Sequence, residues 1–245
     1  MDLRHIALGN RSLEEWEYVM GAASRMGDIG ARIQFLSAHF LGTDYVESTL
    51  IGTSRTREVF VVDFQRVDCM TFIEYVAAMS RSSSFPEFLG NLKRVRYKSG
   101  IVDFYARNHF FSDWRDNNND YIEDVTEGIG GMGTVRVLKK MNEKEDGTAF
   151  IEGIQPVDRE ISFIPSAAIN GSVIDGLKAG DYIGIYSREP GLDVFHTGLF
   201  VRYEGVAYFR HAASKPEHRK VIDQHFREYV AGNPGIVIFR STLQQ

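Results

Sequence analysis

The chain has 245 residues, of which 43% are hydrophobic, and a formal net charge of −5 with a pI near 5.8. This length and composition allow one substantial core, so we expect a single soluble domain over residues 1–245, and a monomer. The acidic balance excludes the broad basic surface with which nucleic-acid-binding proteins displace counterions. No apolar run is long enough to span a bilayer, and the first residues lack the apolar core of a secretory signal.

The first forty residues have apolar side chains at helical spacing, which predicts two amphipathic helices. The first stripe contains Leu13, Trp16, Val19, Met20 and Ala23, and the second contains Ile33, Leu36 and Phe40, before Gly42. A strand is expected at 59–64. Asp68 then precedes apolar residues at helical intervals, so it should cap a helix whose first turn holds Cys69. A shorter helix is expected over 85–95.

The later part of the chain changes from helical to β patterning. A polar, glycine-bearing segment at about 100–135 predicts a loop-rich insertion. After it, strands are expected at 182–186, 194–203, 206–211 and 236–240. Helices followed by antiparallel strands predict an α+β fold.

Cys69 is the only cysteine, which excludes an internal disulfide and a multi-cysteine zinc site. A thiol at a helix N-terminus faces the positive end of the helix dipole, which favours the reactive thiolate. The same helix end can stabilise the oxyanion that forms when a thiolate attacks an amide. A lone cysteine is also often a small buried side chain, so its position alone leaves both interpretations open.

Two histidines on the later strands favour the nucleophile. If Glu204 and Gly205 form a two-residue turn, His196 lies opposite residue 213 and Gly198 lies opposite His211, which puts both imidazoles on one face as diagonal neighbours. His211 could then orient His196 as the third member of a triad. The alternative is a pair of half-buried structural histidines, and a shift of one residue in the turn would move His211 to the other face.

These segments together resemble the NlpC/P60 superfamily of papain-like cell-wall hydrolases, and most of all its amidase-like branch, the DUF1460 family. The resemblance extends from the first helices to the last strand. The residues that carry it are Val67-Asp68-Cys69-Met70-Thr71-Phe72 with Glu74, Arg94 to Tyr97, Phe195-His196-Thr197-Gly198-Leu199, and Arg210-His211-Ala212 with Ser214.

The resemblance implies a papain-like core in which N-terminal helices, including the nucleophile helix, pack on a C-terminal antiparallel sheet. It implies hydrolysis of the bond between (1,6-anhydro-)N-acetylmuramic acid and L-alanine in peptidoglycan fragments, without a metal or organic cofactor. Cys69 would be the nucleophile, His196 the base and His211 its orienting partner. It also implies a location in the bacterial cell envelope, in the periplasm, and leaves a recycling role in the cytoplasm open.

Further residues are candidates for binding the substrate. Arg107 could hold a peptide carboxylate and Trp114 could stack on a sugar, whereas a structural arginine and a core tryptophan are the alternatives. His109 is a rival base. The complete set of substrate-binding candidates is Asp68, Arg94, Tyr97, Arg107, His109, Asp113 and Trp114.

An acidic segment from Asp116 to Glu127 has the ligand spacing of a calcium loop. Its sixth position, where that loop needs glycine, is Tyr121, so we expect a solvated acidic loop rather than a cation site. Gly130-Gly131 lacks the Lys-Ser/Thr of a phosphate loop.

Three other functions remain open. An endopeptidase would use the same chemistry between D-glutamate and the diamino acid of the stem peptide. A non-catalytic muropeptide-binding protein would have an unreactive thiol. An acyltransferase would need an acyl donor and an apolar membrane-facing surface.

Overall fold

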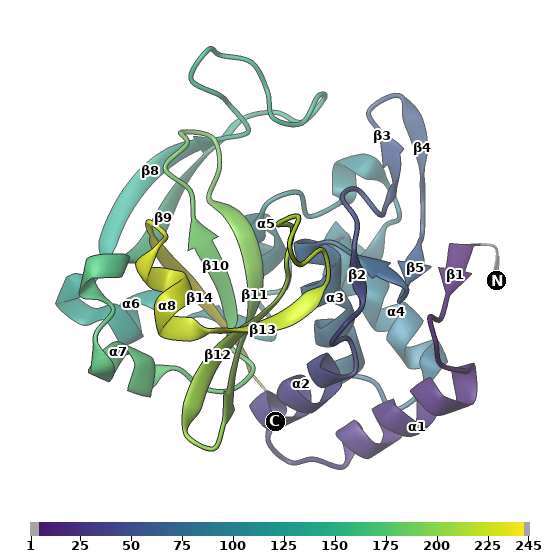
Figure 1. The fold of residues 1–245 in the computed structure, drawn as a ribbon. Coiled ribbons are helices and arrows are strands. Elements are labelled where there is room, and N and C mark those ends of the chain that lie inside the picture. Colours follow the sequence, from purple (N-terminus) through teal and green to yellow (C-terminus); the bar gives the residue numbers. More distant parts are fainter. Residues whose placement is uncertain (1–4, 243–245) are drawn as a thin grey trace. The chain divides into compact units, whose positions relative to one another are not determined.

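The protein is described by a computed structural model that covers residues 5–242 and shows a mixed α/β fold with a large antiparallel sheet (Figure 1). The chain divides into two compact units, each built from two segments. Unit 1 holds the described residues up to Asn108 together with Arg210–Asp223. Unit 2 holds His109–Phe209 and the described residues from Gln224 onward. The single domain expected from the sequence stays a prediction.

The helices of unit 1 begin where the sequence supplies a capping side chain. Ser12 caps α1 (Leu13–Ser24) in a capping box with Glu15, and Asp28 caps α2 (Ile29–Ala38). Ser84 caps α4 (Phe85–Arg96), which also has a proline in its first turn. The expected stripes are buried, except that Leu13 is 42% exposed. Two short 3₁₀ turns follow, Lys98–Gly100 and Phe104–Ala106.

Short strand pairs join these helices. β1 (Ile6–Ala7) pairs with β5 (Val62–Asp63), and β2 (Asp44–Tyr45) pairs with β6 (Arg66–Val67), both in parallel. β3 (Ile51–Thr53) and β4 (Thr56–Val59) form a hairpin. The strand expected at 59–64 is therefore divided between β4 and β5. Aromatic rings fill the space against α3 (Cys69–Ser80), among them Trp16, Phe40, Phe64, Tyr75 and Phe88.

Unit 2 contains most of the large sheet, whose strands lie in the order β13-β12-β11-β10-β14-β9-β8, with β7 also paired to β14. Their bounds are β7 (Ile122–Asp124), β8 (Val135–Met141), β9 (Val157–Pro165), β10 (Tyr182–Tyr186), β11 (Val194–Tyr203), β12 (Val206–Ala212) and β14 (Gly235–Ser241). β12 enters unit 1 at Arg210, and β13 (Val221–His225) leaves it after Asp223. The four strands expected after residue 180 are confirmed to within one residue at each end.

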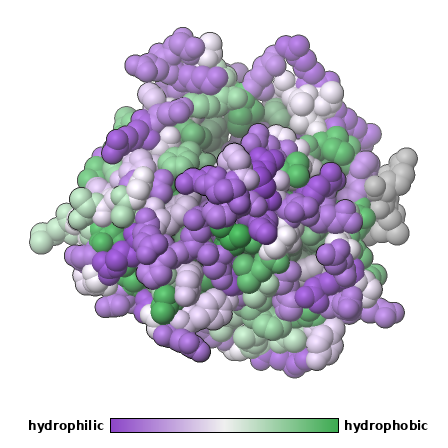
Figure 2. Space-filling model, viewed as in Figure 1, coloured by the Kyte–Doolittle hydropathy of each residue, from purple (hydrophilic) through white to green (hydrophobic). Residues whose placement is uncertain are grey.

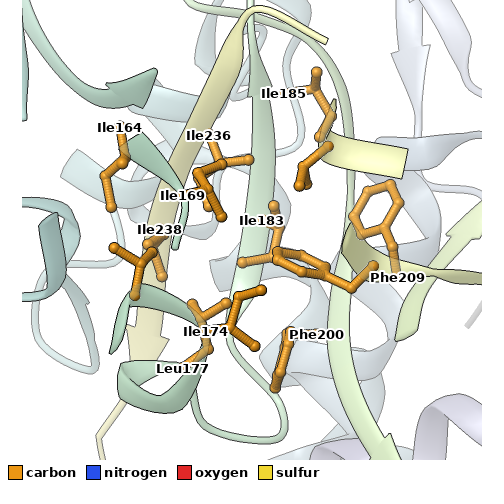
Figure 3. Packing of buried hydrophobic residues seen from close by; sticks show 13 residues of the cluster. Ile164, Ile169, Ile174, Leu177, Ile183, Ile185, Phe200, Phe209, Ile236 and Ile238 are labelled. Atoms are coloured by element: carbon orange, nitrogen blue, oxygen red, sulfur yellow. The ribbon is translucent and has the colours of Figure 1, made fainter. Parts of the chain in front are cut away.

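One face of this sheet carries a tightly packed apolar cluster (Figure 3). Ile183 and Ile185 of β10 lie between Ile236 and Ile238 of β14 on one side and Phe200 of β11 on the other. Side chains from α7 (Gly171–Gly176) and α8 (Phe226–Ala231) cover the cluster. Because alternate residues of a strand share a face, the β pattern of the sequence decided which side chains are buried here.

The loop-rich insertion expected at about 100–135 contains short regular elements from Phe111 onward. α5 (Phe111–Asp116), β7, α6 (Thr126–Gly130) and a 3₁₀ turn at Gly131–Gly133 lie there. The ring of Phe111 stacks on Phe239 at 4.3 Å, and it packs against β10 at Gly184, where a Cβ would lie 2.7 Å from the ring. These elements are too short to show periodicity in the sequence. A further 3₁₀ turn, Ser166–Ala168, follows β9.

The turn between β11 and β12 has the predicted form. β11 ends at Tyr203 and β12 begins at Val206, with φ of 49° at Glu204 and 82° at Gly205. Positive φ at both central residues is the requirement of the hairpin turn that matches strand twist. The two-residue turn is confirmed.

Candidate active site

Cys69 is the first residue of α3, as the sequence predicted. Asp68 caps the helix in a reciprocal arrangement: its side chain accepts from the backbone N–H of Thr71 at 2.7 Å, and the Thr71 hydroxyl accepts from the backbone N–H of Asp68 at 2.9 Å. Cys69 is partly exposed, unlike the ten buried residues that follow from Thr71 to Ser80. The thiol therefore lies at the positive end of a well-capped helix, and solvent can reach its residue.

Tyr45 lies on the strand next to the residues that lead into this helix. It is the Cα partner of Val67, two residues before Cys69, and the backbone N–H of Val46 donates to Val67 at 3.0 Å. Burial is the main cause that raises the pKa of Tyr45 to about 12, with smaller contributions from the negative charges of Cys69, Glu47 and Asp68, while the Arg219 cation opposes the rise. Its phenol is consequently a neutral hydrogen-bond donor at neutral pH. Tyr45 was missed in the sequence because a two-residue strand gives no periodic signal.

A pocket of about 330 Å³ within unit 1 is lined by residues of β1, β5 and β6 and of the segment that follows β2. Its walls include Val46, Thr49 and Arg66, and the hydroxyl of Thr49 lies 3.5 Å from that of Thr71. Arg66 at its rim donates to Asp63 through Nε at 3.0 Å and Nη2 at 2.8 Å. The apolar walls with a few polar groups are typical of a small-molecule site.

His196 lies in β11 of unit 2, opposite Ile185 of β10. Its side chain is only 8% exposed, and its ring contacts that of Phe209 edge-on, with 6.0 Å between centroids. The β10–β11 register shifts immediately beyond this pair, between Ile185 and Tyr186. His196 thus lies on the strand face that also carries the apolar cluster, next to a bulge of the kind that re-aims side chains.

His211 lies in the part of β12 that belongs to unit 1, and it is 3% exposed. Its neighbour Arg210 is fixed by a bidentate pair with Asp223, with both bonds at 2.7 Å, and by a bond to the Ser37 hydroxyl at 3.1 Å. Two residues earlier, Phe209 shares the apolar cluster with Phe200, as the turn register requires. The proximity of His211 to His196 stays a prediction.

Two of the substrate-binding candidates, Tyr97 and Arg107, have an internal partner that the sequence did not reveal. The Arg107 guanidinium forms a bidentate pair with Glu58, and the Tyr97 hydroxyl donates to the same carboxylate at 2.8 Å. The Glu58 side chain is 1% exposed. Arg107 and Tyr97 therefore contribute to the packing of unit 1 through Glu58, and a role for either residue in binding the substrate stays a prediction.

Two more candidates, Asp113 and Trp114, have structural roles in unit 2. Trp114 is fully buried, edge-on to Tyr182 with 4.9 Å between ring centroids, so it presents no face for a sugar. Asp113 accepts from Arg159 at 2.7 Å. The core interpretation of the tryptophan is thus the one that the structure supports.

Arg94 and His109 remain accessible. Arg94 is exposed near the end of α4 in unit 1, and His109 is partly exposed at the start of unit 2. Asp68, the remaining candidate, uses its carboxylate as the cap of α3.

A buried ion pair fixes α3 to α4. Arg96 donates through Nε to Glu74 at 2.6 Å and through Nη1 to the carbonyl of Val61 at 2.7 Å. The side chains are 0% and 3% exposed, and burial raises the pKa of Glu74 while Arg96 opposes that rise. Nη2 of Arg96 has no partner among the described residues. The pair fixes α3 at Glu74, about one and a half helical turns after Cys69.

The acidic segment from Asp116 to Glu127 uses its side chains for protein contacts. Asp116 pairs with Arg115 at 3.0 Å, the amide of Asn118 donates to the carbonyl of Trp114 at 2.7 Å, and Glu127 pairs with Arg136. Within residues 5–242, no three His, Cys, Asp or Glu side chains gather in a group that could hold a metal ion.

The sequence matches the model of a family described as AmiA-like, N-acetylmuramoyl-L-alanine amidase-like, over residues 35–236. No curated protein sequence matches the chain.

Solved structures resemble most of the chain. A DUF1460 protein from Legionella pneumophila has a TM-score of 0.81 at 20% identity, covering 95% of both chains. An N-acetylmuramoyl-L-alanine amidase from Bacteroides uniformis has a TM-score of 0.73 at 25% identity, covering 89% of this chain and all of that one. A Bacteroides fragilis protein described as a xylanase candidate has a TM-score of 0.66 at 25% identity, over 83% of this chain and 98% of that one.

Proposed function

Because the chain belongs to the AmiA-like family of N-acetylmuramoyl-L-alanine amidase-like proteins, we propose that it is a cysteine amidase of peptidoglycan fragments. The bond cut would join (1,6-anhydro-)N-acetylmuramic acid to L-alanine. One observation carries the mechanism: the lone cysteine occupies the first position of a capped helix, partly exposed, where the helix dipole favours a thiolate. We also propose membership of the NlpC/P60 superfamily with its papain-like core.

In the proposed reaction, the Cys69 thiolate attacks the lactyl carbonyl carbon, and His196 holds the thiol proton as imidazolium. The proton then passes to the alanine nitrogen as the C–N bond breaks, leaving a thioester and the free peptide. Water next attacks the thioester with neutral His196 as base, which releases the muramic acid carboxylate and restores the thiol. The helix dipole of α3 and the neutral phenol of Tyr45 would stabilise the oxyanion of both steps.

This scheme assigns the remaining residues as follows. His211 would orient His196 in the tautomer that accepts the thiol proton. Arg94 and His109, which are accessible, stay as proposed contacts for the substrate, with His109 as the rival base. No step of the scheme uses a metal or an organic cofactor.

The test is mass spectrometry of a 1,6-anhydro-muramoyl tripeptide after incubation with the protein. Wild type should release free tripeptide and anhydro-sugar, whereas Cys69→Ala should release neither. His196→Ala should lose at least about 10²-fold in rate, the ordinary contribution of a general base, and His109→Ala should lose far less. The reverse order would make His109 the base.

The products of this experiment, together with three further assays, separate the alternatives. A sugar that keeps L-Ala-D-Glu identifies the endopeptidase. An intact substrate that still binds, with an affinity that iodoacetamide leaves unchanged, identifies a muropeptide-binding protein. Transfer to an added amine acceptor identifies an acyltransferase, and release of sugars from xylan would identify the activity named for the Bacteroides fragilis neighbour.

The family indicates a peptidoglycan substrate and a cell-envelope setting. We propose the periplasm and a monomer. Over residues 5–242, no helix has the length and apolarity needed to cross a membrane.

A further inference from the structure

The turn between β12 and β13 places an arginine beside the strand that flanks the nucleophile. This turn, residues 213–220, lies wholly in unit 1 and includes Lys215, Arg219 and Lys220. Figure 2 shows hydrophilic surface where the tip of the β12–β13 hairpin lies in Figure 1. The carbonyl of Arg219 accepts from the backbone N–H of Tyr45 at 2.8 Å, so the turn is fixed to β2.

The side chain of Arg219 extends over the ring of Tyr45. Its guanidinium carbon lies 4.8 Å from the ring centroid, which holds the cation by cation–π attraction. Arg219 also has φ of 46°, a left-handed conformation that a bulky side chain rarely adopts. Backbone strain of this kind persists where the surrounding structure fixes it, and it is concentrated at functional sites.

The guanidinium remains available to a ligand. Its side chain is 46% exposed, and it forms an ion pair with Glu47, which follows β2, at 3.8 Å; the Glu47 side chain is 74% exposed. An exposed ion pair at that separation contributes little, so a better-placed carboxylate can replace Glu47. A guanidinium binds a carboxylate through two parallel hydrogen bonds, which a neutral amide cannot reproduce.

The proposed substrate has one anion at a suitable distance. The anhydro-sugar is uncharged, and the first carboxylate along the stem peptide is the α-carboxylate of D-glutamate, which is joined to the next residue through its γ-carboxyl. It lies two residues from the scissile bond, at most about 7 Å for an extended chain. Tyr45, over which Arg219 lies, is on the strand paired with Val67, two residues before Cys69.

We propose that Arg219 binds the α-carboxylate of the D-glutamate in the stem peptide, so that the enzyme selects fragments in which this carboxylate is free rather than amidated. This inference rests on the proposed amidase function. It makes Arg219 a specificity-determining residue outside the Cys-His chemistry.

The experiment compares two anhydro-muramoyl tripeptides that differ at one group, the α-carboxylate of D-glutamate or the α-amide of D-isoglutamine. Wild type should have a kcat/KM about tenfold higher for the substrate with the carboxylate. The difference should lie mainly in KM, because the contact between Arg219 and the carboxylate is the same in the ground state and in the transition state. Arg219→Gln puts another non-glycine residue at the same positive φ but removes the charge. It should reduce the ratio of the two kcat/KM values to about twofold or less. Arg219→Lys, which keeps the charge without the fork, should give an intermediate ratio.

Two further variants complete the design. Glu47→Gln removes the competing carboxylate and should leave the ratio equal or raise it. Arg25→Gln, an exposed arginine after α1, should keep the wild-type ratio. Each variant is first shown to unfold at the wild-type urea midpoint, so that a loss of folding is not read as a loss of specificity.

The outcomes are distinct. If wild type cleaves both substrates equally, or if Arg219→Gln keeps the tenfold ratio, the role of Arg219 is refuted while the amidase function stands. If wild type cleaves neither substrate, the proposed function fails and this inference fails with it.

Discussion

The buried pair Glu74–Arg96 predicts the largest effect of a single substitution on stability. Arg96→Met removes the cation and leaves the Glu74 carboxylate, 3% exposed, without its charged partner. Breaking a buried pair from one side costs about 3–5 kcal/mol because the remaining charge is uncompensated. With a urea m-value of about 3 kcal/mol/M, the unfolding midpoint should fall by about 1–1.7 M.

Replacing both partners should restore most of the loss. Arg96 leaves Nη2 without a partner among the described residues, so the pair is incompletely satisfied even in the wild type. Apolar replacements of a buried pair are often neutral. The double variant Glu74→Leu/Arg96→Met should therefore lie within about 1 kcal/mol of wild type.

The pH dependence of the stability of Arg96→Met is a second test of the buried charge on Glu74. In Arg96→Met, burial without the opposing cation raises the pKa of Glu74 further. The folded state then binds a proton that the unfolded chain lacks, so stability should rise as pH falls from 7 toward the ordinary pKa of the unfolded carboxyl. The loss in Arg96→Met should shrink accordingly at pH 5.

The assay is urea unfolding followed by tryptophan fluorescence in a Trp114→Phe background. The chain has two tryptophans, so Trp16 then reports on unit 1 alone. Arg94→Met, an exposed arginine on the same helix, is the matched control and should stay within about 0.5 kcal/mol. A midpoint shift below about 0.3 M for Arg96→Met, or a double variant as unstable as the single one, would refute this reasoning.

Three further predictions concern other parts of the molecule. Gly184→Ala should destabilise unit 2 by about 1–3 kcal/mol in urea unfolding, because the new Cβ would lie 2.7 Å from the Phe111 ring; an unchanged midpoint would contradict this packing. Asp68→Ala should cost about 1 kcal/mol through loss of the α3 cap, while Asp68→Asn, which keeps an acceptor, should cost less; equal losses would show that charge, not capping, matters. Burial lowers the pKa of Lys139 to about 8 from 10.5, so the unfolded chain holds a proton that the folded chain has lost between these values. Stability should therefore rise with pH across this window, by up to about 1.4 kcal/mol per unit, and Lys139→Met should lack that rise in unfolding curves measured at pH 8 and 9.5.

The sequence alone determined the elements whose signals are local. The position of Cys69 at the start of a helix followed from a capping residue and a helical stripe, both contained within about twelve residues. The strands after residue 180 followed from alternation of period two, and the turn at Glu204-Gly205 from a dipeptide that accepts positive φ. Rules of this kind depend only on neighbouring residues in the sequence, and not on the residues that pack against the element in the folded protein.

Only the tertiary structure decided which residues the candidate side chains contact. Arg107 looked like a ligand for a carboxylate, and its carboxylate proved to be Glu58, 49 residues away in the chain. From the sequence, Trp114 could equally stack on a sugar or lie in the core, and in the structure it packs in the core against the ring of Tyr182. Tyr45 and Arg219 gave no signal at all, because a strand of two residues and an irregular turn have no period. Residue type fixes what a side chain can bind, but long-range packing fixes whether the protein itself has already bound it.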